Sequence, residues 1–98
     1  MEFEKLSLHD ATLLEIRCEW KASQCLFSLS TSHGNSELVF EGVTDISIPH
    51  NNPWGPSVSV NETRKLPESA YEIEMQSGDL IRITAKSWRF DDNSEQEP

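Results

Sequence analysis

Basic residues, cysteines and long apolar runs are all scarce in this sequence of 98 residues. Seventeen acidic residues stand against 8 lysines and arginines, which gives a formal net charge of −9. A surface of this sign repels phosphate backbones, because nucleic-acid binding depends on lysine and arginine displacing counterions. No apolar run approaches the roughly 20 residues that a membrane-spanning helix needs. We therefore expect no nucleic-acid or membrane partner, whereas a basic protein is a permissible partner.

Cysteine, histidine and glycine are too sparse or too scattered for the usual small catalytic and metal sites. The only cysteines, Cys18 and Cys25, are too few for a disulfide framework and lack the spacing of metal ligands. The histidines His9, His33 and His50 stand far apart, and the four glycines occur singly rather than in a phosphate-binding loop. The sequence predicts no metal, no cofactor and no catalytic residue, and it favours a protein that is not an enzyme.

The length and the ends of the chain bound its organisation. Ninety-eight residues suffice for one domain, which we assign to residues 1–90. Residues 91–98 contain four acids, no base and no apolar side chain, so we expect a disordered acidic tail. The first five residues are acidic where a signal peptide would be basic and then apolar, so we expect a cytoplasmic protein.

What the sequence does contain is a repeated alternation of apolar and polar residues, which is typical of half-buried β-strands. Six strands are predicted, over residues 14–20, 25–30, 38–48, 58–60, 71–76 and 81–90, and residues 2–14 stay open between helix and strand. Gly42 is interpreted as a bulge within the third strand. The pattern predicts an all-β fold, an antiparallel six-stranded meander forming a curled sheet, a small sandwich or a partly open barrel. Such a sheet has edges to protect, so a homodimer is a further hypothesis.

The alternation also predicts which side chains of the first hairpin face the core. The inward face of the first strand is formed by Leu14, Ile16, Cys18 and Trp20. A turn centred between Lys21 and Ala22 places Cys18 directly opposite Cys25, within the range of a disulfide. In a reducing cytosol we favour two buried thiols.

The turn after residue 75 can be chosen by matching side chains across the hairpin. A three-residue loop of residues 76–78 pairs Ile73 with Ile81 and Tyr71 with Ile83, which keeps apolar residues together. A two-residue turn would instead bring a charged residue onto the apolar face. Gly78 must then adopt a positive φ, which β-branched residues do not tolerate.

The segment from residue 48 to residue 58 is rich in proline and contains one tryptophan. Three prolines fix φ and lower the entropy of the unfolded loop, so the segment is expected to hold one shape. A stiff loop that presents Trp54 between Pro53 and Gly55 is suited to anchor a protein partner. In so small a chain we favour the other interpretation, in which Trp54 folds back and covers one end of the sheet. Asn61, Glu62 and Arg64 follow the loop and are predicted to border the same partner-binding surface.

His9 and Asp10 have the residue types of a base and its orienting carboxylate. Adjacent residues of an extended chain point to opposite faces, so we do not expect a hydrogen bond between the two side chains. A turn in which Asp10 accepts a backbone N–H is the preferred interpretation. A pocket at one end of the sheet, formed by His9, Asp10, His50 and Asn52, would support an alternative function as a small-ligand binder or hydrolase.

Three sequence patterns carry a resemblance to a known group of proteins. They are the tetrapeptide Leu8-His9-Asp10-Ala11, the pair Glu19-Trp20, and the run Pro53-Trp54-Gly55-Pro56-Ser57-Val58-Ser59-Val60-Asn61-Glu62. Together they resemble a family of small uncharacterised bacterial proteins, over most of residues 6–85. That family implies no activity or site residue. In size and composition alone, the chain is also similar to the immunity proteins of bacterial toxin systems.

These observations support three hypotheses about function. The leading one is a non-enzymatic, acidic protein-interaction module that neutralises a basic partner in the manner of an immunity protein, since opposite charge speeds association. The alternatives are the small-ligand binder or hydrolase described above and a self-associating structural subunit.

Overall fold

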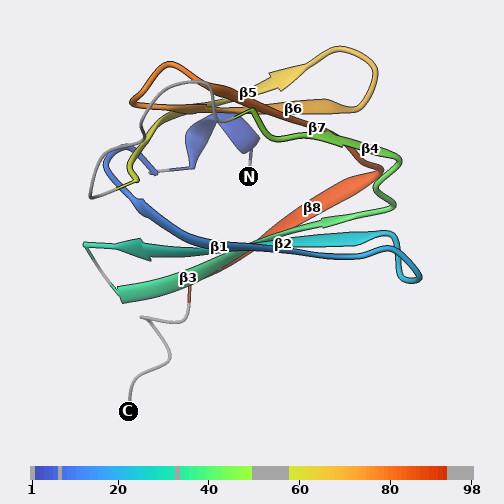
Figure 1. The fold of residues 1–98 in the computed structure, drawn as a ribbon, viewed down its shortest axis with the longest axis horizontal. Coiled ribbons are helices and arrows are strands. Elements are labelled where there is room, and N and C mark those ends of the chain that lie inside the picture. Colours follow the sequence, from blue (N-terminus) through green and yellow to red (C-terminus); the bar gives the residue numbers. More distant parts are fainter. Residues whose placement is uncertain (1, 7, 33, 50–57, 93–98) are drawn as a thin grey trace.

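A computed structural model describes residues 2–6, 8–32, 34–49 and 58–92. These residues form one short 3-10 helix and eight strands, arranged as two antiparallel four-stranded sheets that face each other (Figure 1). The elements are η1 (Phe3–Lys5), β1 (Thr12–Glu19), β2 (Gln24–Thr31), β3 (Gly34–Glu41), β4 (Asp45–Ser47), β5 (Val60–Leu66), β6 (Ala70–Met75), β7 (Leu80–Thr84) and β8 (Ser87–Asp92). The predicted all-β antiparallel class is confirmed, with eight strands in place of six.

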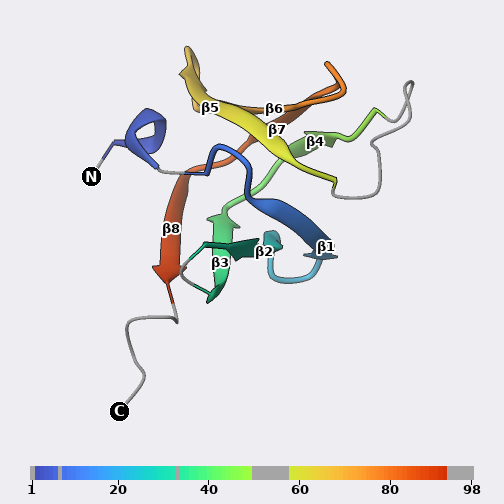
Figure 2. The same ribbon diagram turned by 90° about the vertical axis from the view of Figure 1, so that its left-hand side faces the viewer.

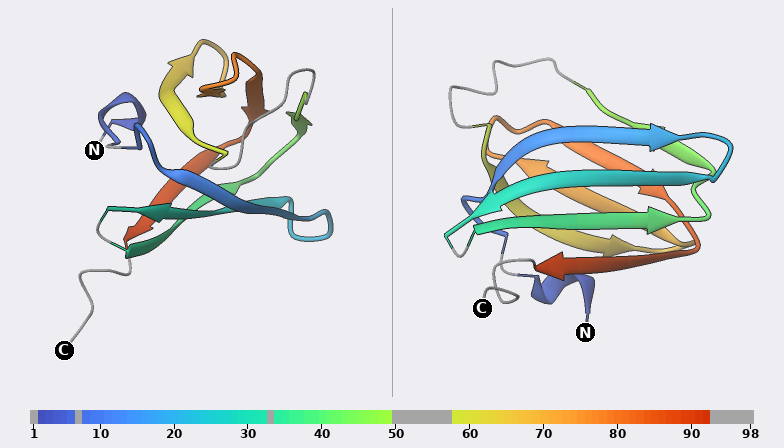
Figure 3. Two further views of the ribbon diagram at one scale, coloured as in Figure 1. Left: turned by 60° about the vertical axis from the view of Figure 1, so that its left-hand side comes forward. Right: turned by 90° about the horizontal axis from the view of Figure 1, so that it is seen from below.

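Each of the two sheets contains strands from both halves of the chain. One sheet has the order β1-β2-β3-β8, and its strands lie side by side in the right-hand view of Figure 3. The other sheet has the order β4-β7-β6-β5. Each sheet is therefore a three-stranded meander extended by one strand from the other half of the chain. The prediction of one continuous meander is wrong, because β4 and β8 change layers.

The chain crosses from one sheet to the other at residues 42–44 and again at residues 85–86, and these two crossing segments lie side by side. Gly42 follows the end of β3 and has a φ of +67°. At this residue the chain turns away from the first sheet toward the second. The Thr44 N–H donates to the Thr84 carbonyl (2.9 Å), and the Lys86 N–H donates to the Glu41 carbonyl (2.9 Å). A Cβ added at Gly42 would lie 2.7 Å from Cγ of Lys86, so the close approach of the two crossings requires glycine there.

These crossings correct two predicted strands. The predicted strand over residues 38–48 is divided between β3 and β4, which belong to different sheets. The predicted strand over residues 81–90 is divided in the same way between β7 and β8. The inward positions shift by one residue at each crossing, from Phe40 to Val43 and from Ala85 to Trp88. A β-bulge within one strand produces the same shift, so the pattern alone does not mark a change of sheet.

The core lies between the facing surfaces of the two sheets and uses the side chains that alternation places inward. As predicted, the buried residues include Cys25, Phe27 and Leu29 on β2, Tyr71, Ile73 and Met75 on β6, and Ile81, Ile83 and Ala85 on and after β7. Glu72 alternates with the core residues of β6 and therefore lies on the outer face of its sheet, yet only 6% of its surface is exposed. Two arginines account for this burial, as described below.

The register of the first hairpin is confirmed. Cys18 lies directly opposite Cys25, and both are free thiols. Burial of Cys25, together with the neighbouring Cys18 thiol, raises the pKa of Cys25 to about 12. Cys25 is therefore protonated and behaves as a small apolar core residue.

The register of the β6–β7 hairpin is also confirmed. Ile73 pairs with Ile81 and Tyr71 pairs with Ile83, as side-chain matching predicts. The Gly78 N–H closes the turn by donating to the carbonyl of residue 75 (2.9 Å), and Gly78 has a φ of +100°. Gly78 therefore has the positive φ that the sequence predicts.

The predicted inward face of β1 is wrong at both of its ends. The register against β2 shifts at Leu14, so that Leu13 is buried and Leu14 is 57% exposed. Trp20 lies in the turn that follows the strand and is 65% exposed. Between them, Ile16 and Cys18 pack against the core as expected.

Residues 2–14, which the sequence left open, form η1, a turn and the start of β1. The buried ring of Phe3 contacts the rings of Phe40 (5.9 Å between centroids), Tyr71 (5.0 Å) and Trp88 (5.3 Å). η1 lies on the side of the molecule where β8 runs, while β1 and β4 lie on the opposite side (Figure 2). η1 therefore joins the two layers along one side.

Two further boundaries differ from the prediction. The strand predicted over residues 58–60 extends through β5 to Leu66. Residues 61–65 are all polar, and Thr63 is buried opposite Ile73, so this part of the strand shows no alternation of apolar and polar residues. β8 continues to Asp92, two residues into the segment predicted to be a disordered tail, and residues 93–98 lie outside the described residues. No helix within the described part of the chain is long and apolar enough to cross a membrane.

Candidate functional site

The turn predicted before β1 is present, and it places the side chains of His9 and Asp10 side by side rather than on opposite faces, with no hydrogen bond between them. Asp10 has a φ of +70°, and Nε2 of His9 lies 3.7 Å from Oδ2 of Asp10. Oδ1 of Asp10 accepts a hydrogen bond from Nε2 of Gln76 (2.6 Å), where the sequence predicted a backbone donor. The positive φ rotates the carboxylate back toward the imidazole, which is why the rule for an extended chain fails here.

The His9–Asp10 pair lies at the surface of the molecule. The His9 and Asp10 side chains are 66% and 72% exposed. Nδ1 of His9 donates to the carbonyl oxygen of Asn61 (2.8 Å), which fastens the turn to the start of β5. His50 and Asn52, the other members of the predicted pocket, lie outside the described residues.

The predicted partner-binding residues fall into two groups. Pro53, Trp54 and Gly55 lie outside the described residues, so the role of this loop stays a prediction. Asn61, Glu62 and Arg64 lie on β5, at the edge of the second sheet.

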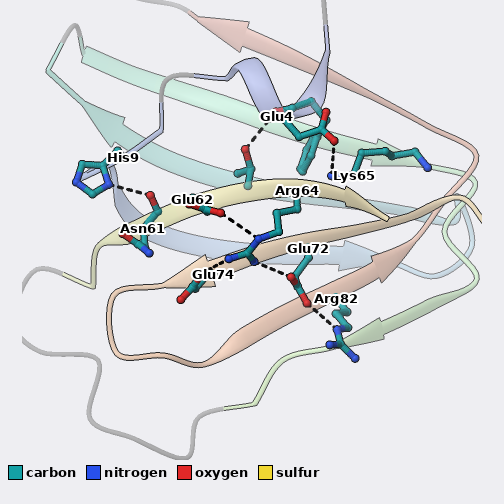
Figure 4. Close-up of polar contacts among 11 residues, drawn as sticks. Glu4, His9, Asn61, Glu62, Arg64, Lys65, Glu72, Glu74 and Arg82 are labelled. Atoms are coloured by element: carbon teal, nitrogen blue, oxygen red, sulfur yellow. Dashed lines mark hydrogen bonds and ion pairs between the residues drawn. The ribbon is translucent and has the colours of Figure 1, made fainter. Parts of the chain in front are cut away.

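Arg64 is the centre of an ion-pair cluster on the outer face of that sheet (Figure 4). Its Nε lies 3.0 Å from Oε2 of Glu62, its Nη1 donates to Oε1 of Glu72 (2.7 Å), and its Nη2 donates to Oε1 of Glu74. The second oxygen of Glu72 accepts from Nε of Arg82 (2.9 Å). Arg64, Glu72 and Arg82 stand in one cross-strand row of β5, β6 and β7, so the register of the sheet aligns the charges.

The cluster determines the charge states of its members. The hydrogen bond with Glu74, followed by the contacts with Glu72 and Glu62, raises the pKa of Arg64 above its ordinary value, against the effect of burial. Burial opposes the charge of Glu72, but hydrogen bonds from Arg82 and Arg64 outweigh it and lower the pKa of Glu72. Arg64 is thus held by three carboxylates within its own sheet and offers a partner little free positive charge.

The outer face of the other sheet carries a different arrangement of charge. Residues directly opposite each other on neighbouring strands share a face, which gives two acidic rows on either side of a row with arginines. The acidic rows are Glu19-Gln24-Glu41-Ser87 and Glu15-Ser28-Glu37-Asp91, and the row between them is Arg17-Leu26-Val39-Arg89. Five carboxylates and two guanidinium groups leave this face with a net charge of −3.

A hollow of about 530 Å³ lies on this sheet where the chain bulges at Leu14. It is lined by Leu14, Glu15, Ser28, Leu29, Asn35, Ser36 and Glu37. Glu15 and Glu37 belong to the same row, with Ser28 between them, and Leu14 adds an exposed apolar side chain. Two carboxylates beside an aliphatic surface suit a cation with an apolar stem, such as a lysine or arginine side chain.

Sequence reasoning missed Leu14, Glu37 and Trp20 as surface features, because it placed Leu14 and Trp20 in the core. One signal was present in the consecutive leucines Leu13 and Leu14. Neighbouring residues of a regular strand point to opposite faces, so an apolar pair at the start of a half-buried strand indicates a bulge.

No group of histidine, cysteine, aspartate or glutamate side chains in residues 2–6, 8–32, 34–49 and 58–92 is arranged to hold a metal ion. Comparison of the chain with protein-family models, with curated proteins and with solved structures finds no match.

Proposed function

We propose that this protein is a non-enzymatic interaction module that binds a basic protein partner through the outer face of the β1-β2-β3-β8 sheet. The observation that carries the proposal is the hollow that Glu15 and Glu37 line together with the exposed Leu14. A protruding lysine or arginine of the partner places its charge between the carboxylates and its methylene groups against the leucine.

The charge of the whole face supports this function. A net charge of −3 on one face attracts a positively charged surface over a distance of about 10 Å at ordinary ionic strength and raises the rate of encounter. The arginines of the central row contact carboxylates of the same face, as shown by Arg89 Nη1 to Glu41 Oε2 (2.6 Å) and Arg17 Nη2 to Glu15 Oε1 (3.4 Å). Neutralisation of a basic toxin in the cytoplasm is one role that such a surface would serve.

A second candidate role is self-association, favoured by the position of β1. This strand of eight residues lies at the edge of its sheet, and Leu14 and Trp20 at its ends are the most exposed large apolar side chains of the described chain. Edge strands with exposed apolar residues are common sites of pairing between chains. The hydrolase alternative has weaker support, since His9 and Asp10 are open to solvent.

The binding proposal is tested by NMR titration of the labelled protein with a lysine-rich peptide, using a glutamate-rich peptide of equal length as the ligand control. Amide shifts are expected around Leu14, Ser28 and Glu37 with the basic peptide alone. The double variant Glu15→Gln/Glu37→Gln is expected to weaken binding by about tenfold, which corresponds to the loss of two charge contacts.

A matched variant separates this site from a general effect of charge. Glu2→Gln/Glu68→Gln removes the same two charges from exposed positions outside the face and is expected to weaken binding only slightly. Equal weakening by both double variants, or shifts spread evenly over both sheets, would contradict the proposal.

A further inference from the structure

We propose that two copies of the chain pair antiparallel along β1, about a two-fold axis at Cys18. This inference rests on the second candidate role, self-association, and specifies the contact surface. The first residues of the outer edge of β1 are already occupied, since Thr12 forms a bridge with Ser59 and the Leu13 N–H donates to the Val58 carbonyl (2.9 Å). From Glu15 to Glu19, β1 pairs only with β2 among the described residues.

The other sheet edges in the described chain are less open. η1 covers β5, where Thr63 Oγ1 donates to the Phe3 carbonyl (3.1 Å) and the Lys65 N–H donates to Glu4 Oε2 (3.1 Å). β8 has Phe3 against Trp88, and β4 is only three residues long. β1 thus combines an uncovered edge with exposed apolar side chains at both ends.

The charges along β1 select the register of the pair. With Cys18 on the two-fold axis, Arg17 lies opposite Glu19 of the second copy, and Glu15 lies opposite Lys21 in the turn that follows the strand. Opposite charges face each other at every charged position, and each attraction occurs twice because of the symmetry.

Neighbouring registers are less favourable. An axis at Arg17 would place two arginines opposite each other and Glu15 opposite Glu19, so like charges would repel. An axis at Ile16 would match Glu15 with Arg17 but would leave Trp20 without a hydrophobic neighbour on the second strand. The Cys18 register instead places Trp20 opposite Ile16, a half-buried residue that packs against the core.

The pairing leaves the hollow on the outer face accessible, because strands add at the edge of a sheet rather than over its faces. The two copies then form one continuous eight-stranded sheet with a hollow on each half. The net charge of −9 per chain opposes association at low ionic strength, so the measurement belongs at physiological salt, where the Debye length is about 8 Å.

The test reverses the charges of Arg17 and Glu19, which face each other across the proposed dimer contact. The dimer dissociation constant is measured by sedimentation equilibrium over a wide range of protein concentration. Arg17→Glu places a second carboxylate opposite Glu19, and Glu19→Arg places two guanidinium groups opposite each other. Each single variant is expected to raise the dimer dissociation constant by about tenfold, while the double variant and an equimolar mixture of the two single variants restore it. Thermal melts of each variant confirm that the monomer remains folded.

A disulfide cross-link between the two copies tests whether the two-fold axis lies at Cys18. In the Cys25→Ala background, Cys18 has no partner in its own chain, and diamide is expected to join two copies by a Cys18–Cys18 disulfide, accepting the two electrons and two protons that the thiols release. Leu29→Cys in the Cys18→Ala and Cys25→Ala background places a lone thiol in the core and serves as the control that does not cross-link.

Several results would overturn the inference. If the wild-type protein stays monomeric at every concentration, it does not self-associate, and the inference is wrong. A dimer that both single variants leave intact uses another surface, and a dimer weakened by Arg17→Glu but not by Glu19→Arg has its axis at Ile16. None of these outcomes affects the peptide titration, which tests the binding of a basic partner separately.

Discussion

At the scale of single residues, Glu72 shows how this sheet stabilises a nearly buried charge on its outer face. Its side chain is 8% exposed, and its two oxygens accept from Arg64 and Arg82 on the neighbouring strands. Removing one member of such a set leaves the other charges without their partner, which costs more than the pair contributes while intact. The outer face therefore depends on the register of three strands.

Glu72→Gln is expected to lower the free energy of unfolding at pH 7 by about 1–3 kcal/mol, because Arg64 and Arg82 lose a shared anion. Since the folded-state pKa of Glu72 is lowered, its contribution is complete above the unfolded pKa of about 4.3 and is lost as pH falls through the folded value. Urea denaturation from pH 7 to strongly acidic pH should show the gap between wild type and variant closing below about pH 4. Glu68→Gln, at an exposed turn position, is the control and should show almost no gap. A gap independent of pH would contradict this assignment.

At the scale of elements, the β6–β7 hairpin has a turn whose conformation only glycine adopts freely. Gly78 has a φ of +100°, and a Cβ added there would meet no atom within 4 Å. Any cost of substitution therefore comes from the backbone and not from a clash.

Gly78→Ala is expected to lower the free energy of unfolding by about 1–2 kcal/mol, and Gly78→Val by more, because β-branching further restricts positive φ. Chemical denaturation measures both variants, and NMR checks that the Ile73–Ile81 pairing persists. A valine variant as stable as the alanine variant would show that the turn relaxes to another type. Ser87→Ala, at an exposed strand position, is the control.

The registers of the two hairpins were predictable because each depends only on residues that are close together in the sequence. Matching Ile73 with Ile81 and Cys18 with Cys25 needs only the period of two and the length of one turn. Gly42 shows the limit, since a glycine at positive φ occurs both in a bulge and in a crossing to another sheet. Which of the two occurs depends on the partner of the next strand, more than 30 residues away at Thr84.

The candidate site was less predictable than the fold for a related reason. The hollow exists because one bulged residue, Leu14, leaves the core, and because β3 brings Glu37 next to β2. The predicted sites relied on conspicuous residue types such as histidine and tryptophan. Glu15 and Glu37 are unremarkable in the sequence and gain significance only from the register of three strands.

At the scale of the whole molecule, the side chain of Phe3 joins the two layers. It is 2% exposed and contacts Phe40 and Trp88 on one sheet and Tyr71 on the other. A small protein buries only part of the surface its unfolded chain exposes, so one such contact is a large fraction of its stability.

Phe3→Ala is expected to lower the free energy of unfolding by about 3–5 kcal/mol, because it leaves a cavity among three aromatic rings. Urea denaturation followed by tryptophan fluorescence measures the change, since Trp88 borders the cavity. Leu14→Ala, at a position 57% exposed, should change stability by less than about 0.5 kcal/mol. A Phe3→Ala variant as stable as wild type would show that η1 contributes nothing to the joining of the layers.

The exchange of β4 and β8 between the layers has a consequence for how the chain reaches its native state. β3 cannot complete its pairing until β8 has been synthesised, because Glu41 pairs with Ser87 and Ser36 with Asp92. Contacts this distant in sequence are slow to form, since a long loop must close before any pairing energy is gained. Each three-stranded meander lacks the fourth strand of its sheet until the other half of the chain is present, so a ribosome-bound chain remains an incomplete sandwich until β8 has emerged.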